Sequence, residues 1–216
     1  MPRYLDLESW PRRQHYEFFR SFDQPFWNLC AEVDVTALHR RCEQAGGPSF
    51  AVAAFYLSLL AANEVEELRY RLRGEEVLVH ERIHGGSTVL RPDDTFVFAY
   101  FDFHSSFARF APPARAALEA ARSGSGKLEP RWDRDDLIHY SVLPWVAFTS
   151  FAHARKHNPG DSVPKIVFGR HQDRAGRRLL PVSVEVHHAL VDGLHVGRFF
   201  ARFQHYLDEL PLGELP

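Results

Sequence analysis

The C-terminal part of the chain alternates apolar and polar residues with a period of two. Val182, Val184 and Val186 alternate with polar neighbours, which predicts a strand over about residues 179–187 with one protected face. Asp173-Arg174-Ala175-Gly176 predicts a hairpin turn before it. Short apolar or extended runs predict the other strands, at about residues 26–33, 69–72, 77–83, 87–90, 95–103, 138–143, 146–151 and 165–171.

Longer segments carry apolar residues at helical spacing. Residues 49–63 are apolar nearly all round, which predicts a helix buried on most sides. In residues 195–207 the spacing of Val196, Phe199 and Phe203 predicts a helix packed on the sheet. Pro112-Pro113 predicts a break or a late start in the helix expected over 105–122. The other predicted helices are 11–20 and 35–45, and loops are predicted at 123–126 and 153–164.

This mixture of helices and strands predicts an α+β fold, a two-layer sandwich of helices on a large mixed sheet. A chain of 216 residues is long enough for one large core, so a single domain over 1–216 is expected. The 18 Phe, 7 Tyr and 4 Trp residues are mostly core by base rate, but they also suit a pocket for a flat, apolar ligand.

Charge and hydropathy disfavour two classes of partner. The formal charge of −2 gives no general attraction to nucleic acid or anionic membrane. No apolar run reaches the roughly twenty residues of a membrane helix, and the first residues lack the apolar core of a signal peptide, so a cytoplasmic location is expected. The isolated Cys30 and Cys42 are expected to be structural thiols.

The strand over 179–187 leads into a candidate general base. His188 continues the parity of the three valines, so it is expected to project toward the protected face and His187 away from it. A neutral imidazole, with a pKa of about 6.5, can take a proton from an alcohol or a thiol near neutral pH. Asp192, four residues further on, could orient this base or fix the loop by pairing with an arginine, and His188 could also be a plain core histidine.

A metal site is the other interpretation of the same segment. His187, His188, Asp192 and His195 offer nitrogen and oxygen ligands within a short stretch, as a metal-dependent hydrolase would need. Alternation separates the two adjacent histidines, and no second ligand cluster occurs in the sequence, so no metal is expected. Base catalysis would also need a donor to a developing oxyanion, and Ser141 offers a hydroxyl in an otherwise apolar strand.

Three blocks, in order along the chain, resemble the chloramphenicol acetyltransferase family. His187-His188-Ala189-Leu190-Val191-Asp192-Gly193-Leu194-His195-Val196 is similar to the motif HHxxxDGxHV, whose HHxxxDG core is shared by a wider group of CoA-dependent acyltransferases. Trp10-Pro11-Arg12-Arg13-Gln14-His15-Tyr16-Glu17-Phe18 resembles WxRREHFEF, and Tyr140-Ser141-Val142-Leu143-Pro144-Trp145-Val146 resembles ISALPWV. The similarity spans almost the whole chain.

The resemblance implies a role for each motif residue. His188 would take the proton from the acceptor hydroxyl that attacks acetyl-CoA, and Ser141 would hydrogen-bond the tetrahedral oxyanion. Asp192 would be structural and pair with Arg12. Members of the family are homotrimers with active sites between subunits, so His188 would complete a pocket furnished largely by a neighbouring chain.

The resemblance also implies binding residues for the two substrates. The acceptor side would be lined by Phe19, Trp27, Phe96 and Phe151, and the CoA side by Trp145, Arg170 and His171. The sequence departs from the family's usual pocket pattern at Glu129, His153 and Val167. These departures leave chloramphenicol and another hydroxylated small molecule open as the acceptor, beside two other classes, a metal-dependent hydrolase and a catalytically silent binding module.

Overall fold

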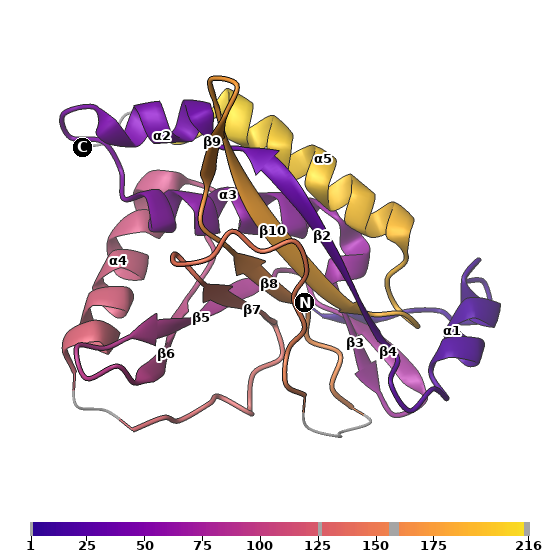
Figure 1. The fold of residues 1–216 in the computed structure, drawn as a ribbon. Coiled ribbons are helices and arrows are strands. Elements are labelled where there is room, and N and C mark those ends of the chain that lie inside the picture. The colour runs from indigo at the N-terminus through magenta and orange to yellow at the C-terminus, as the bar shows by residue number, and fades with distance from the viewer. Residues whose placement is uncertain (1, 125–126, 156–159, 214–216) are drawn as a thin grey trace.

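The computed structural model describes residues 2–124, 127–155 and 160–213. Residues 125–126 and 156–159 of the two predicted loops lie outside these ranges. In the described part, seven strands form one sheet in the order β2-β10-β8-β7-β5-β6, with β9 paired to β10 (Figure 1). Their bounds are β2 Phe26–Asp34, β5 His84–Leu90, β6 Phe96–Phe101, β7 Leu137–Val142, β8 Lys165–Phe168, β9 Gln172–Arg174 and β10 Arg177–His187.

Parallel and antiparallel pairs coexist in this sheet. The pairs β5–β7 and β7–β8 are parallel, whereas β10 runs antiparallel to β2, β8 and β9. A separate small sheet has the order β1-β4-β3, with bounds Arg3–Tyr4, Glu76–Val79 and Tyr70–Arg73. The predicted α+β arrangement of helices on a large mixed sheet is therefore confirmed.

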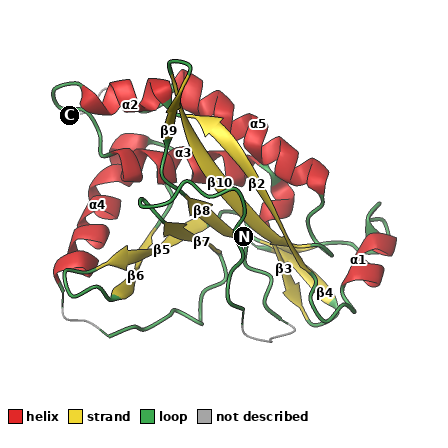
Figure 2. Cartoon of the chain, viewed as in Figure 1, coloured by secondary structure: helices red, strands yellow, loops and turns green. Residues whose placement is uncertain are grey.

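Helices build the second layer, except for the first one, which lies beside the small sheet (Figure 2). Their bounds are α1 Arg13–Phe19, α2 Thr36–Glu43, α3 Phe50–Glu64, the 3₁₀ turn η1 Glu66–Arg69, α4 Phe107–Ser123 and α5 Gly193–Glu209. Val182, Val184 and Val186 of β10 join the same core as Phe199 and Phe203 of α5. The predicted buried helix is confirmed, because α3 is buried along most of its length.

Strand alternation gives the large sheet a second face, turned away from this core, which we call the far face. It carries His139 and Ser141 of β7, Lys165 and Val167 of β8, and Ser183, Glu185 and His187 of β10. The segment that links β7 to β8 covers part of this face, since Arg155 bonds to Glu185 and stacks on Phe26 of β2.

Two local predictions were wrong. Residues 146–151 form no strand, because Leu143 bonds to Phe168 and β8 already occupies the place beside β7, so the chain turns away from the sheet. Pro112 and Pro113 do not break α4. Both prolines lie on its exposed side, where water can satisfy the carbonyls that lose their amide partners.

No helix in the described ranges is long and apolar enough to cross a membrane.

Candidate active site

The turn that follows β10 is built around the guanidinium of Arg12. Its Nε and Nη2 donate to the two carboxylate oxygens of Asp192 at 2.7 and 2.6 Å. Its Nη1 donates to the carbonyls of Leu190 and Ala189, and Nη2 also reaches the carbonyl of His188 at 3.3 Å. The side chain is only 13% exposed. Nearly all the N–H donors of this planar guanidinium are therefore hydrogen-bonded to the turn and hold its shape.

Asp192 has a second structural task at the start of α5. It is the N-cap residue of this helix and forms a capping box with His195, whose Nδ1 accepts from the Asp192 amide at 2.9 Å. His195 in turn lies 3.3 Å from Glu67 through Nε2. Partial burial opposes ionisation of Asp192, but the hydrogen bonds and charge of Arg12 outweigh it and lower the pKa of this carboxyl.

The ring of His188 lies between two aromatic side chains. It stacks on Phe19 with the ring centroids 3.8 Å apart and the planes at 5°, and Trp27 lies 5.6 Å away. Nδ1 is 3.3 Å from Asp192, yet it is buried and makes no hydrogen bond within the described residues. This geometry gives Asp192 no oriented bond to the imidazole, and the carboxylate is instead committed to Arg12.

His187 turns to the opposite side of the strand, as alternation predicts, but it is the more protected histidine. It is 3% exposed and packs edge-on against Phe26. The His188 side chain is 33% exposed, although its ring contacts Trp27 on the side of the valines, as expected. His188 lies just beyond the last residue of β10, at the end of the sheet, which explains its greater exposure. Burial and the positive charge of Arg155 lower the pKa of His187 to about 4.

We expect this histidine to make folding sensitive to acid. Between pH 6.5 and pH 4 the unfolded chain binds a proton at His187 that the folded protein does not, so the free energy of unfolding falls by up to about 3 kcal/mol as the pH is lowered. Protonation would also end the bond that Nδ1 accepts from the Ala189 amide. Denaturant titrations should show a weaker pH dependence for His187→Asn, which keeps an acceptor without titrating; an unchanged slope would rule out this contribution.

The histidines and Asp192 of this turn are not arranged as metal ligands. Of the His, Cys, Asp and Glu residues in the described ranges, no three are grouped so as to hold a metal ion. The rings of His187 and His188 contact different aromatic residues on opposite sides, and His195 is engaged with Glu67.

The residues expected around the acceptor are brought together only in part. Phe19 and Trp27 contact His188 directly. Phe151 lies on the β7–β8 link, where its ring contacts Phe148 and His153. Phe96 is 47% exposed on β6, at the other edge of the large sheet.

Ser141 and His188 of one chain are far apart. In the sheet register, Ser141 of β7 pairs with Val167 of β8, and Val167 pairs with Ser183 of β10. Ser141 and Ser183 are therefore two strand spacings apart. His188 lies well beyond Ser183 along the chain. At about 3.4 Å per residue and about 4.8 Å between strands, the two residues are roughly 19 Å apart. They cannot act on the same carbonyl group within one chain.

The residues expected near CoA lie around the turn after β7. Trp145 is 57% exposed, and the Arg170 amide donates to the carbonyl of Val146 at 2.9 Å, which brings the two expected residues to the same surface. The His171 ring lies 4.8 Å from that of His39, and burial together with His39 lowers its pKa. An exposed indole beside an exposed guanidinium suits a purine and its phosphates.

The three residues that depart from the family pattern have different surroundings. Glu129 is exposed, His153 bonds to Glu185 through its amide and ring, and Val167 is fully buried beside Ser141. Sequence reasoning missed the charged group to which His153 belongs, which includes Arg155, Lys165 and Glu185. The signal was a glutamate inside the apolar alternation of residues 182–186.

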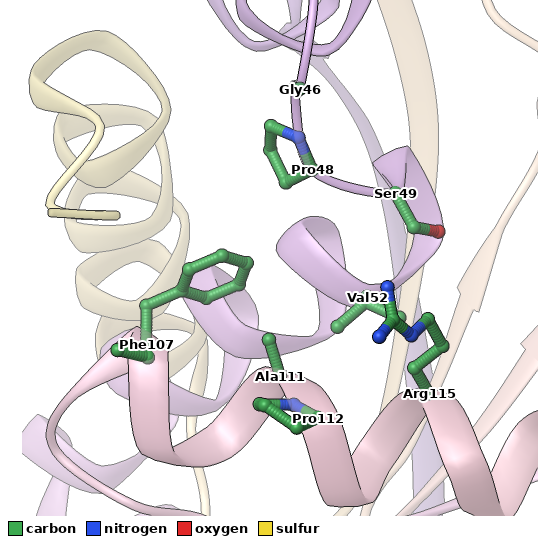
Figure 3. A pocket seen from close by; sticks show the side chains of 10 residues that line it. Gly46, Pro48, Ser49, Val52, Phe107, Ala111, Pro112 and Arg115 are labelled. Atoms are coloured by element: carbon green, nitrogen blue, oxygen red, sulfur yellow. The ribbon is translucent and has the colours of Figure 1, made fainter. Parts of the chain in front are cut away.

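A cavity is found at the start of α3, where that helix meets α4 (Figure 3). None of the residues predicted for catalysis or binding lines it. Its lining includes Pro48, Ser49, Val52, Phe107, Ala111 and Arg115.

Comparison with known proteins identifies one family. The family model described as chloramphenicol acetyltransferase matches residues 3–204. The chain is 30% identical to chloramphenicol acetyltransferase 3 of Escherichia coli over 93% of its own length and 94% of the relative's. It is 31% identical to the chloramphenicol acetyltransferase of Streptomyces acrimycini, over 94% and 93% of the two lengths.

Solved structures show the same relationship. A chloramphenicol acetyltransferase structure at 28% identity superimposes with a TM-score of 0.88 over 96% of this chain and 100% of the other. The dihydrolipoamide acetyltransferase of Azotobacter vinelandii, at 20% identity and a TM-score of 0.64 over 91% and 86% of the two chains, shares the fold. This chain belongs to the chloramphenicol acetyltransferase family.

Proposed function

We propose that the protein transfers the acetyl group of acetyl-CoA to a hydroxyl group of chloramphenicol. The observation that carries this proposal is the Arg12–Asp192 pair, which fixes the turn bearing His188 and leaves its ring against Phe19 and Trp27. The names of the relatives support the drug as acceptor. Release of CoA thiol that depends on added chloramphenicol tests it.

His188 acts as the general base in this proposal. Its ring lies against Phe19 and Trp27, and it accepts the proton of the acceptor hydroxyl as the oxygen attacks. Arg12 and Asp192 position this ring through the turn and do not touch the substrates. Phe19, Trp27, Phe96 and Phe151 provide apolar surface for the acceptor.

Acetyl-CoA supplies the thioester carbonyl that the hydroxyl attacks. The Ser141 hydroxyl donates a hydrogen bond to the oxygen of that carbonyl as negative charge develops there. As the carbonyl re-forms, the carbon–sulfur bond to CoA breaks, and the leaving thiolate takes the proton from protonated His188. Trp145, Arg170 and His171 bind the coenzyme at the surface beside the turn after β7, and the exposed guanidinium of Arg170 is suited to phosphate. No metal takes part in these steps.

We infer that the protein works as a homotrimer whose active sites lie between subunits. The separation of roughly 19 Å between Ser141 and His188 within one chain supports this, because both must reach one reacting carbonyl. Each site would then combine His188 of one subunit with Ser141 of its neighbour. Residues 1–216 would act as one acyltransferase domain, and the cytoplasmic location stays a prediction from the sequence.

Mixing two inactive variants tests this arrangement. His188→Ala and Ser141→Ala trimers should each have low activity, and unfolding and refolding an equal mixture should restore about one quarter of the wild-type turnover, since that share of random interfaces has both residues intact. Refolding each variant alone is the control. If the refolded mixture is no more active than its components, the shared site is wrong.

An acyltransferase acting on another hydroxylated small molecule is the second candidate. The charged group around His153 and Glu185 favours it, because this group lies beside Phe151. A comparison of kcat/KM for chloramphenicol and other primary alcohols separates the two candidates. No contact in the described structure favours the metal-dependent hydrolase or the silent binding module.

A further inference from the structure

A row of polar and charged side chains crosses the far face next to Ser141. The strand registers place His139 opposite Lys165 and Lys165 opposite Glu185, so these three side chains lie side by side on β7, β8 and β10. His139 and Ser141 project from the same face of β7, because they are two positions apart. The row therefore begins beside the residue proposed to bind the oxyanion.

The other end of the row lies beneath a residue proposed to line the acceptor site. The Glu185 carboxylate accepts from the amide of His153 and lies 3.4 Å from its ring nitrogen. The ring of His153 in turn contacts Phe151, with the centroids 4.8 Å apart. An acceptor seated between Ser141 and Phe151 would therefore face this row.

Both nearby carboxylates are already engaged. Arg155 donates through Nε to Glu185 and through Nη1 to Asp161 at 2.8 Å, and its guanidinium lies 3.3 Å over the Phe26 ring. Burial opposes ionisation of Glu185, but His153 and Arg155 outweigh it and lower its pKa to about 2. Glu185 is thus a carboxylate at neutral pH whose charge Arg155 balances.

Lys165 has no such counterion. Its ammonium donates to the carbonyl of Ala154 at 3.2 Å, and within the described ranges it takes part in no salt bridge. Burial and the neighbouring Arg155 lower its pKa. A half-buried ammonium with a single neutral partner is costly to keep charged, and an anionic group of a ligand would offset that cost.

We propose that Lys165 is a specificity-determining residue of the acceptor site, whose ammonium binds a planar anionic substituent with one negative charge shared by two oxygen atoms. A carboxylate has this chemistry. The nitro group of chloramphenicol is neutral overall, but it presents two oxygen atoms in the same geometry with partial negative charge. The proposal rests on the proposed function, because it takes Ser141 and Phe151 as two sides of the acceptor site. The neutral His139 beside Lys165 adds no competing positive charge, since burial lowers its pKa to about 4.

The test compares two probes of equal shape and different charge. Naphthalene-2-carboxylate and naphthalene-2-carboxamide are titrated into the purified protein, and their dissociation constants are measured without acetyl-CoA. We expect the carboxylate to bind about five- to tenfold more tightly to the wild type, as a charge-assisted hydrogen bond predicts. Chloramphenicol should displace it.

Variants assign this preference to the lysine. Lys165→Met should abolish it and Lys165→Arg should retain it, and circular dichroism checks that both fold. Arg122→Met, which removes one positive charge from the exposed end of α4, is the matched control and should retain the preference. Equal affinities in the wild type, no binding of either probe, or a preference that survives in Lys165→Met would overturn the proposal.

The two proposals fail separately. Probe binding needs no turnover, whereas the proposed function is measured by thiol release with chloramphenicol. A retained carboxylate preference without drug-dependent thiol release would count against chloramphenicol as the acceptor and not against Lys165. Thiol release without any carboxylate preference would count against Lys165 alone.

Discussion

Replacing His188 with alanine is expected to lower kcat for acetyl transfer by about 10²- to 10⁴-fold, because the acceptor hydroxyl loses the group that takes its proton. The fold should persist, since the ring is 33% exposed and its main support is stacking on Phe19. Initial rates of thiol release and denaturant unfolding curves measure the two effects. KM for acetyl-CoA should change little, because His188 is not among the residues assigned to the coenzyme.

His205→Ala is the matched control for this substitution. His205 is exposed on α5, so its removal should leave both kcat and the unfolding curve unchanged. A His188→Ala protein that keeps more than about a tenth of the wild-type kcat would show that another group accepts the proton.

Breaking the Arg12–Asp192 pair is expected to have the second largest effect. Arg12→Ala should lower the free energy of unfolding by about 2–4 kcal/mol, because it leaves the Asp192 carboxylate partly buried without its counterion and frees three carbonyls of the turn. Asp192→Ala should cost a similar amount and also remove the N-cap of α5. Both should lower kcat, since the turn positions His188.

A double-mutant cycle measures the coupling directly. The Arg12→Ala, Asp192→Ala protein should lose clearly less stability than the sum of the two single losses, because the pair itself can be lost only once. Arg12→Lys should not restore stability, because an ammonium cannot supply the two-pronged bond. Arg3→Ala, which removes the exposed pair with Glu66, is the control and should cost less than about 1 kcal/mol. Additive losses for Arg12 and Asp192 would contradict direct coupling.

Much of the fold follows from local patterns in the sequence. The alternation of Val182, Val184 and Val186 predicts β10, and the apolar run at 49–63 predicts α3. In each of these segments the buried residues recur at the period of a strand or a helix, so the spacing alone predicts the secondary structure. Residues 146–151 have the composition of a strand but form none, because their place in the sheet depends on where β8 lies, which local sequence does not encode.

The part of the candidate site that could be predicted is the turn after β10, where one motif contains both His188 and Asp192. The hydrogen bonds between Arg12 and Asp192 agree with the pairing inferred from resemblance. Alternation places the two adjacent histidines on the correct sides but does not reveal that His187 is the more deeply buried one. The row of His139, Lys165 and Glu185 was not foreseen. Its members come from three strands, so only the pairing register brings them together. The distance between Ser141 and His188 within one chain also depends on this register, so it could not be predicted from the sequence.

One assay tests the central claim most directly, namely that this chain acetylates chloramphenicol. Folded wild-type protein is incubated with acetyl-CoA, free CoA thiol is followed over time with and without chloramphenicol, and the drug is analysed for an added acetyl group by mass spectrometry. We predict rapid thiol release that requires the drug and matches the amount of acetylated product, and that is lost in His188→Ala. Thiol release that is absent, or unaffected by chloramphenicol, in protein shown to be folded would contradict the proposed function.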